Sequence, residues 1–195
     1  MRIHTFARAA LLLGATLLAS CDGSPSATDD QPRVSFRYSG VFAGTFDVRA
    51  PRPPGEGPRT QPYIDAFPPA DGAFRVLSLG LTNGRRDVLF LQAPTAPGDY
   101  PLGSCAGLPV CPNIAGSFGV EDANGNLLPG GREFQVISGT ITVLSPTREG
   151  WVRGRFSGTA QVMVNIYDSW RVEGMMDITN GTFHVPVAQL LTGAP

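Results

Sequence analysis

The sequence predicts an all-β fold, an antiparallel sandwich or flattened barrel of about nine or ten strands. Three observations predict it. No stretch beyond residue 20 repeats apolar side chains with the period of 3.6 residues that marks an amphipathic helix. Short runs of alternating apolar and polar residues recur instead. The chain of 195 residues also contains 24 Gly and 18 Pro, which favours many turns over long helices.

We expect strands at eight places along the chain, separated by Gly, Pro and Asn. Their approximate ranges are 34–39, 41–49, 73–81, 86–92, 115–121, 133–144, 151–164 and 170–185. Segment 51–62 carries five prolines, which cannot donate to a β-ladder, so we expect a loop there. Asn124-Gly125 suits a hairpin turn with positive φ.

Alternation is clearest in segment 151–164, where one face is apolar and the other is polar. The residues predicted to point inward are Val152, Gly154, Phe156, Gly158, Ala160, Val162 and Val164. Those predicted to point outward are Arg153, Arg155, Ser157, Thr159 and Gln161. A period of two along a whole strand indicates a sheet with one buried face.

The neighbouring strands follow from the same alternation, because a slip of one residue would turn a whole apolar set toward water. A fold around Tyr167 pairs Val162 with Val172, Ala160 with Gly174, Gly158 with Met176 and Phe156 with Ile178. A fold around the loop 145–150 pairs Val143 with Val152, Ile141 with Gly154, Gly139 with Phe156 and Ile137 with Gly158. The C-terminal third is therefore predicted to be a three-stranded meander in which large side chains face small ones.

Residues 1–20 have the layout of an export signal. Arg2 and Arg8 give a positively charged start, and the apolar run 9–18 that follows is too short for a bilayer core of ~30 Å. The run leads to Leu18-Ala19-Ser20-Cys21, which resembles the lipobox of bacterial lipoproteins. The resemblance implies cleavage after Ser20 and a diacylglycerol thioether on Cys21, which would anchor the protein to a membrane of the cell envelope. An ordinary secretory signal with an incidental cysteine is the alternative.

Segment 21–32 is then expected to be the lipidated cysteine and a flexible tether, because residues 22–32 contain no large apolar side chain. The remaining residues, 33–195, are enough for one all-β domain with a core. Without Arg2 and Arg8 the chain keeps 13 arginines against 16 acidic residues, a net charge of −3. That balance gives no electrostatic basis for binding nucleic acid.

Four short elements resemble those of a known kind of protein. They are 98–103 (GDYPLG), 139–143 (GTITV), 154–160 (GRFSGTA) and 178–183 (ITNGTF). Their order is similar to that of small all-β bacterial envelope lipoproteins whose domain has no assigned function. The resemblance extends over residues 97–185 and implies the fold. It implies no catalytic or binding residues.

Two cysteines remain once Cys21 is lipidated, and both are in the segment 104–113. Cys105 and Cys111 are separated by six positions, which differs from the C-x-x-C of redox proteins. In an oxidising compartment such a pair predicts a structural disulfide. A free or metal-bound pair is the alternative.

A calcium loop is one further interpretation of the sequence. Asp122, Asn124, Asn126 and Glu133 match positions 1, 3, 5 and 12 of such a loop, whereas its position 6 is Leu127 in place of Gly. No helix is predicted on either side, so we expect a hairpin turn there. Neither a metal nor a cofactor is expected.

Catalytic groups are sparse in the sequence. His184 is the one histidine outside the leader, and without a G-x-S-x-G motif we expect it on a polar strand face. Glu173 and Asp177 share the polar face of one strand beside Arg153 and Arg155 of the next. Cross-strand ion pairs would explain all four residues. Paired carboxylates of a glycoside hydrolase are the alternative.

Three functions are compatible with these patterns. We expect a non-enzymatic module that binds or scaffolds a protein, a glycan or a small molecule at the membrane surface. The second is a carrier of a small apolar ligand inside a barrel, and the third is a carboxylate-dependent enzyme acting on glycans. A filled core with a flat face would favour the module, a continuous apolar cavity the carrier, and converging carboxylates in a cleft the enzyme.

Overall fold

A computed structural model of the chain confirms the all-β fold class. It describes residues 31–49, 63–70, 72–82, 85–105, 107–108, 110–122, 128–146, 150–166 and 169–186. These residues form ten strands and no helix: β1 (Arg33–Gly40), β2 (Gly44–Val48), β3 (Tyr63–Ala70), β4 (Ala73–Thr82), β5 (Arg85–Pro94), β6 (Gly98–Leu102), β7 (Asn113–Asp122), β8 (Arg132–Leu144), β9 (Trp151–Ile166) and β10 (Ser169–Pro186). Among them there is no helix of the length and apolarity that a membrane crossing requires.

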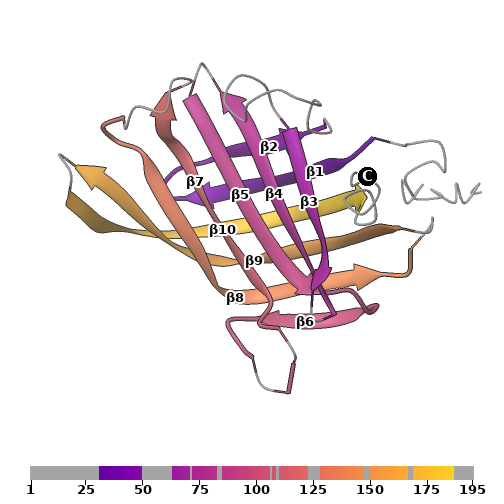
Figure 1. Cartoon of the computed structure of the whole chain (residues 1–195). Coiled ribbons are helices and arrows are strands. Elements are labelled where there is room, and N and C mark those ends of the chain that lie inside the picture. The colour runs from indigo at the N-terminus through magenta and orange to yellow at the C-terminus, as the bar shows by residue number, and fades with distance from the viewer. Residues whose placement is uncertain are drawn as a thin grey trace, which may run out of the picture.

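The ten strands form a single antiparallel sheet that folds over on itself. Its order is β2-β1-β10-β9-β8-β7-β5-β4-β3, and β6 pairs with β8 beside this path. In Figure 1, β3, β4, β5 and β7 cross steeply in front of β1, β2, β9 and β10. Strand β2, at one end of the path, contacts β4, near the other end. The sheet is therefore nearly closed, between a sandwich and a barrel.

Strand β8 joins the two layers because it bends. Its first part pairs with β7, where Phe134 lies opposite Gly116. Its second part pairs with β6, where Ile141 lies opposite Tyr100. The bend contains a bulge and Gly139, whose φ is 141°. A Cβ atom at Gly139 would collide with the backbone of β9, so the bend requires glycine.

The interior between the layers is filled by aromatic side chains. Phe74 of β4 packs on Phe183 of β10, with ring centroids 5.4 Å apart. Phe36 of β1 lies 6.4 Å from the ring of Phe118 in β7. All four rings are nearly inaccessible to solvent. Because these contacts join opposite layers, burial of this apolar surface holds the folded-over sheet together.

Each of four glycines lies directly opposite an aromatic residue of the neighbouring strand. The pairs are Gly44 with Tyr38, Gly116 with Phe134, Gly154 with Phe183, and Gly181 with Phe156. A Cβ atom at any of these glycines would collide with the opposing ring. The rings therefore lie flat across the neighbouring backbone, which is how aromatic residues compensate for glycine in sheets.

The predicted meander of β8, β9 and β10 is confirmed, and so are the two faces of its central strand β9. Phe156 is 3% exposed, whereas Arg155 next to it points to solvent. The predicted partners are wrong by two or three residues. Phe156 lies opposite Ile141 and Gly181 rather than Gly139 and Ile178.

Bulges and loop geometry explain the wrong partners. On the β10 side, bulges between Val172 and Gly174 and between Ile178 and Gly181 each add a residue. On the β8 side, the shift already exists at the loop, where Leu144 pairs with Arg153. The bulges also place two apolar residues outside, since Ile137 is 49% and Val172 61% exposed.

Two strands were not expected from the sequence. Strand β3 contains Pro68 and Pro69, but it lies at an end of the sheet, where proline is tolerated. Strand β6 has five residues and pairs with β8 alone. The expected loop 51–62, the turn at Asn124-Gly125, and the leader and tether up to residue 30 lie outside the described residues.

Candidate binding surfaces on the outer side of the sheet

An unusually apolar surface crosses the outer side of β4, β5, β7, β8 and β9. It consists of two rows of directly paired residues. One row is Leu77, Phe90, Ala115, Gln135 and Gln161, and the other is Leu79, Val88, Ser117, Glu133 and Met163. We call these ten residues the outer band. The apolar members are at least half-buried although they alternate with core residues, a position that is usually polar.

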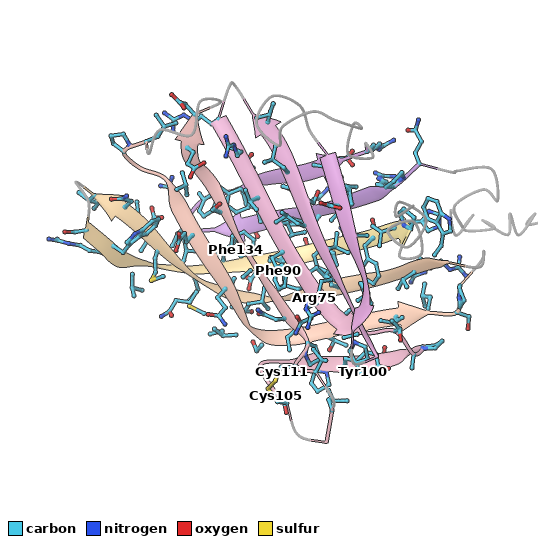
Figure 2. All side chains as sticks on the ribbon, in the orientation of Figure 1. Arg75, Phe90, Tyr100, Cys105, Cys111 and Phe134 are labelled. Carbon is cyan, nitrogen blue, oxygen red and sulfur yellow. A yellow bond between two sulfur atoms is a disulfide. The ribbon has the colours of Figure 1, made fainter. Side chains whose placement is uncertain are left out.

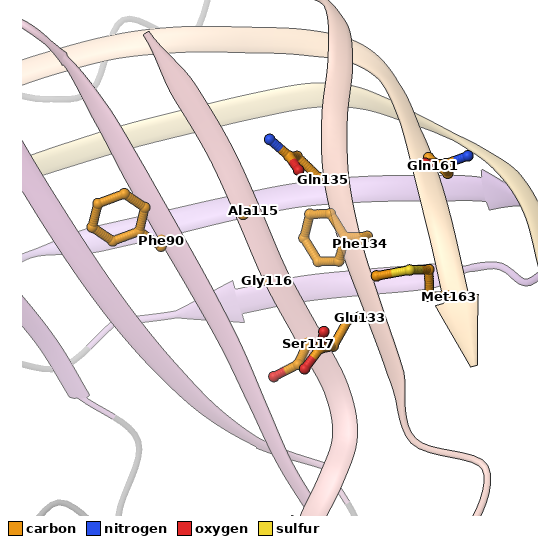
Figure 3. Close-up of a pocket in the computed structure, with 9 residues that line it drawn as sticks. All are labelled: Phe90, Ala115, Gly116, Ser117, Glu133, Phe134, Gln135, Gln161 and Met163. Atoms are coloured by element: carbon orange, nitrogen blue, oxygen red, sulfur yellow. The ribbon is translucent and has the colours of Figure 1, made fainter. Parts of the chain in front are cut away.

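Two hollows lie along the outer band. The first, of about 360 Å3, is lined by Phe90 of β5 and by the band residues of β7, β8 and β9, together with Gly116 and Phe134 (Figure 3). The second, of about 370 Å3, lies over β4, β5 and β7 and reaches Glu133 of β8. Ser117 and Glu133 line both hollows, so the two adjoin at these residues, and we call them together the depression.

Polar residues border the outer band on both sides. On one side, Arg75 Nε donates to Gln92 Oε1 at 2.7 Å, and Gln92 Nε2 donates to the carbonyl of Cys111 at 3.2 Å. On the other side, Arg86 Nη1 donates to Glu121 Oε2 at 2.7 Å. An apolar patch with a polar rim is typical of interaction surfaces.

The loop at the first border contains the predicted disulfide. The Sγ atoms of Cys105 and Cys111 are 2.10 Å apart, which is bonding distance. Figure 2 shows the pair below the two layers, beyond Arg75 and Phe90. The disulfide therefore anchors the loop that receives the hydrogen bond from Gln92.

Glu133 lies in the middle of the depression and is half-buried. Within the part of the chain that the structure describes, its carboxylate has no hydrogen bond or ion pair. A carboxylate in this position can accept hydrogen bonds from a cation of a partner. Glu133 therefore gives the outer band one fixed negative charge.

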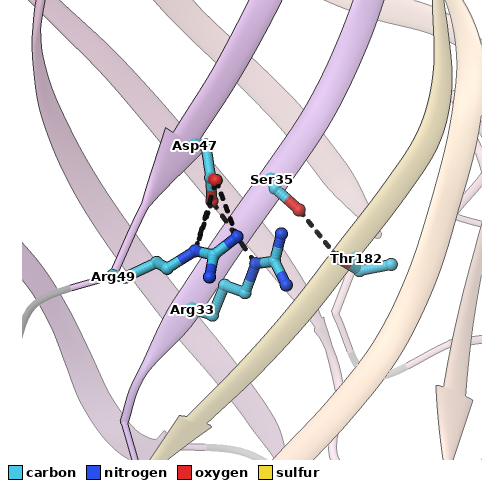
Figure 4. A network of polar contacts seen from close by, with 5 residues as sticks. All are labelled: Arg33, Ser35, Asp47, Arg49 and Thr182. Atoms are coloured by element: carbon cyan, nitrogen blue, oxygen red, sulfur yellow. Dashed lines mark hydrogen bonds and ion pairs between the residues drawn. The ribbon is translucent and has the colours of Figure 1, made fainter. Parts of the chain in front are cut away.

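The other layer carries a polar outer surface. A row of paired residues crosses β6, β8, β9, β10, β1 and β2, namely Asp99, Thr142, Arg155, Thr182, Ser35 and Asp47. We call this the polar row. Thr142 Oγ1 donates to Asp99 at 2.6 Å, and the hydroxyls of Ser35 and Thr182 are 2.9 Å apart. Figure 4 shows its other end, where Arg33 and Arg49 both donate to Asp47.

The expected ion pairs between β9 and β10 are wrong. Glu173 instead accepts hydrogen bonds from Nε and Nη2 of Arg132, at 2.6 and 2.8 Å. Asp177 accepts a hydrogen bond from Thr159 at 3.0 Å, and Arg153 donates to the Ser145 carbonyl. The bulge beside Glu173 changes its direction, which explains the difference.

The Arg132–Glu173 pair closes one end of the interior. Hydrogen bonds from Arg132 lower the pKa of Glu173, and the same pairing raises the pKa of Arg132. The guanidinium of Arg132 also stacks 4.9 Å from the ring centroid of Phe42. Phe42 in turn contacts Phe118, with centroids 5.3 Å apart. Charged and aromatic groups together cover the core at this end.

Tyr38 and Asp87 lie next to this closed end. Burial raises the pKa of Tyr38, and the negative charge of Asp87 raises it further. Asp87 is itself buried, and its carboxylate accepts a hydrogen bond from the Gly119 backbone N–H at 2.9 Å. Burial therefore restrains the Tyr38 and Asp87 side chains, and the hydrogen bond from Gly119 compensates for the burial of the Asp87 carboxylate.

The remaining sequence-predicted site residues are not brought together. Asp122 is in β7 and Glu133 in β8, while Asn124, Asn126 and Cys21 lie outside the described residues. The described chain contains no group of three or more His, Cys, Asp or Glu residues that could hold a metal. His184 is half-buried, and its ring packs 4.5 Å from the ring of Trp151.

Comparison with known proteins adds no relative: no protein-family model, curated protein or solved structure matches the chain.

Proposed function

We propose that this protein is a lipid-anchored envelope module that binds an extended segment of another protein through the outer band. The lipid anchor rests on the lipobox-like sequence ending at Cys21. The observation that carries the binding role is the apolar depression across five strands on the outer side of the sheet. Such a surface favours recognition of a partner over storage of a ligand inside the fold.

The chemistry of the depression favours an extended segment. Phe90 and Met163 provide apolar walls, and Gln135 and Gln161 offer amide groups to a peptide backbone (Figure 3). The free carboxylate of Glu133 complements a Lys or Arg of the partner. The expected partner segment therefore has alternating apolar side chains and one basic residue.

The other two functions have less support. A carrier needs interior space, whereas Phe36 and Phe74 make ring contacts across the interior of this domain. A glycoside hydrolase needs a protonated carboxylic acid near a second carboxylate. Glu121 and Glu133 line the same hollow, but the carboxylate of Glu121 is already engaged in an ion pair with Arg86 at 2.7 Å.

Site-specific photo-crosslinking in the native envelope tests the binding role. A photoreactive residue at Gln135 of the full-length chain should give an adduct of one defined mass, and the same residue at exposed Thr45 of β2 should not. Glu133→Arg should reduce the Gln135 adduct at least tenfold, because it replaces the negative charge with a positive one. Equal adducts at both positions, or an unchanged yield with Glu133→Arg, would refute the proposal.

The anchor is tested separately. Cys21→Ala should block maturation and release the domain from the membrane fraction. A variant that is still processed and resists a carbonate wash would show that no lipid on Cys21 holds the protein.

A further inference from the structure

A third hollow lies on the polar surface, away from the outer band. It has a volume of about 420 Å3 and opens on the outer side of β8, β9 and β10. Its polar lining residues are Thr140, Thr142, Arg155, Ser157, Asn180 and Thr182. Arg155 is separated from Gln161 of the outer band by six positions along β9, so the two surfaces are distinct.

Arg155 is the only charged residue among those that line this hollow. It is exposed, and no hydrogen bond or ion pair joins it to another residue in the described part of the chain. Two acids on the same surface have other partners, because Asp99 accepts a hydrogen bond from Thr142 and Asp177 accepts one from Thr159. Its guanidinium is therefore available for an anionic ligand, with a geometry that suits carboxylate.

The floor of the hollow is formed where β10 bulges. Asn180 has a φ of 53°, the left-handed conformation, and the register shifts between Ile178 and Gly181. Gly181 has no side chain, and the ring of Phe156 covers it from the core side of the sheet. The bulge therefore gives a floor of sheet backbone beside the Asn180 amide.

We propose that this hollow binds an acidic glycan, with the carboxylate of a sugar on Arg155. The hydroxyls of Thr140 and Ser157 and the amide of Asn180 can donate to and accept from sugar hydroxyls. The hydroxyl of Thr142, which donates to Asp99, can still accept. A peptide fits less well, because β8, β9 and β10 are each paired on both sides at this hollow and offer no free backbone edge. The site is independent of the outer band and of the partner proposed for it.

Calorimetric titration of the full-length chain with a short oligogalacturonate tests this assignment. The same oligomer with every carboxyl methyl-esterified provides the matched neutral ligand. We expect the acidic oligomer to bind at least tenfold more tightly than the ester. Arg155→Gln should remove that preference, whereas Arg153→Gln on the same strand should change the Kd less than twofold. Both variants should unfold at the wild-type temperature.

Four results would overturn the proposal. The first is that the acidic oligomer does not bind, and the second is that the ester binds equally well. The third is that Arg153→Gln weakens binding as much as Arg155→Gln does. The fourth is that acetate, or a peptide with a free C-terminal carboxylate, competes as well as the oligomer at equal concentration. That result would assign the hollow to simple carboxylates or to chain ends. Because Glu133→Arg leaves this hollow intact, failure of one proposal is separable from failure of the other.

Discussion

The two outer surfaces of this protein differ although one sheet forms both. In the outer band, strand alternation places Leu77, Val88 and Phe90 toward solvent. In the polar row, the same alternation places Thr142, Arg155 and Thr182 there. Strand β9 contributes to both surfaces. The requirement for a core fixes the inward residues, so the composition of the outward residues is free to carry function.

The largest effect is expected at the boundary between core and polar surface. Phe156 contacts Phe36 and Phe183, with ring centroids 5.8 and 6.5 Å away. Phe156→Ala should lower the free energy of unfolding by about 3–5 kcal/mol, as truncation of a buried Phe does. Arg155→Ala should cost less than about 1 kcal/mol, because its side chain is exposed. Urea denaturation measures both, and equal losses would mean that the strand is buried on both sides.

A smaller effect is expected at the border of the outer band. The Cys105–Cys111 disulfide closes a loop of six residue steps. Loss of this disulfide should lower the free energy of unfolding by about 2 kcal/mol, because the open loop gains conformational entropy in the unfolded chain. Unfolding of the oxidised protein and of a Cys105→Ser, Cys111→Ser double variant provides the measurement. No difference between the two would mean that the loop unfolds independently of the band beside it.

A pH-dependent effect is expected at the closed end of the interior. The pKa of Glu173 is lowered in the folded protein, so its ionised form stabilises the fold. Glu173→Gln should cost about 1 kcal/mol at pH 7, a value near that of partly exposed pairs. The difference in the free energy of unfolding between the variant and wild type should become smaller once the pH is below the unfolded-state pKa of about 4.3. It should vanish as the pH falls through the lower folded-state pKa. Urea titrations at pH 7 and pH 3 provide the comparison, and a constant difference would rule out this origin.

The smallest effect on stability is expected within the outer band. Phe90→Gln makes the band resemble the polar row while leaving the core unchanged. It should cost about 1 kcal/mol or less, since the ring is only partly buried. Binding of a hydrophobic dye should fall by more than half, with exposed Thr45→Gln as the control. Unchanged dye binding would mean that the apolar surface of the protein lies elsewhere.

Sequence alternation predicted the inner face well and the pairing poorly. It placed Phe156 inside and Arg155 outside, and both positions are confirmed. It could not locate bulges, because a bulge such as the one between Ile178 and Gly181 changes partners without changing local composition. The glycine at 181 is a signal for it only once the opposing ring of Phe156 is known.

The candidate sites were predicted less completely. The disulfide followed from the spacing of Cys105 and Cys111 and the expected oxidising compartment, and it is confirmed. The outer band was missed, although the run 76–81 (VLSLGL) has apolar residues at both alternating sets of positions, which is typical of a strand covered on two faces. Arg155 was wrongly assigned to an ion pair. Which acid an arginine meets depends on the register of the strands, and alternation does not define the register.

The position of β10 in the sheet has a consequence for how the chain folds during synthesis. This last described strand lies between β9 and β1, so Arg33 pairs with His184 across most of the chain. The β1–β2 hairpin precedes the other strands, but no other strand pairs with it in the sheet until β10 is complete. Pairing of such distant segments is slow because a long loop must close first. The native sheet therefore forms only after nearly the whole chain has been made, and a nascent chain must be kept from aggregating until then.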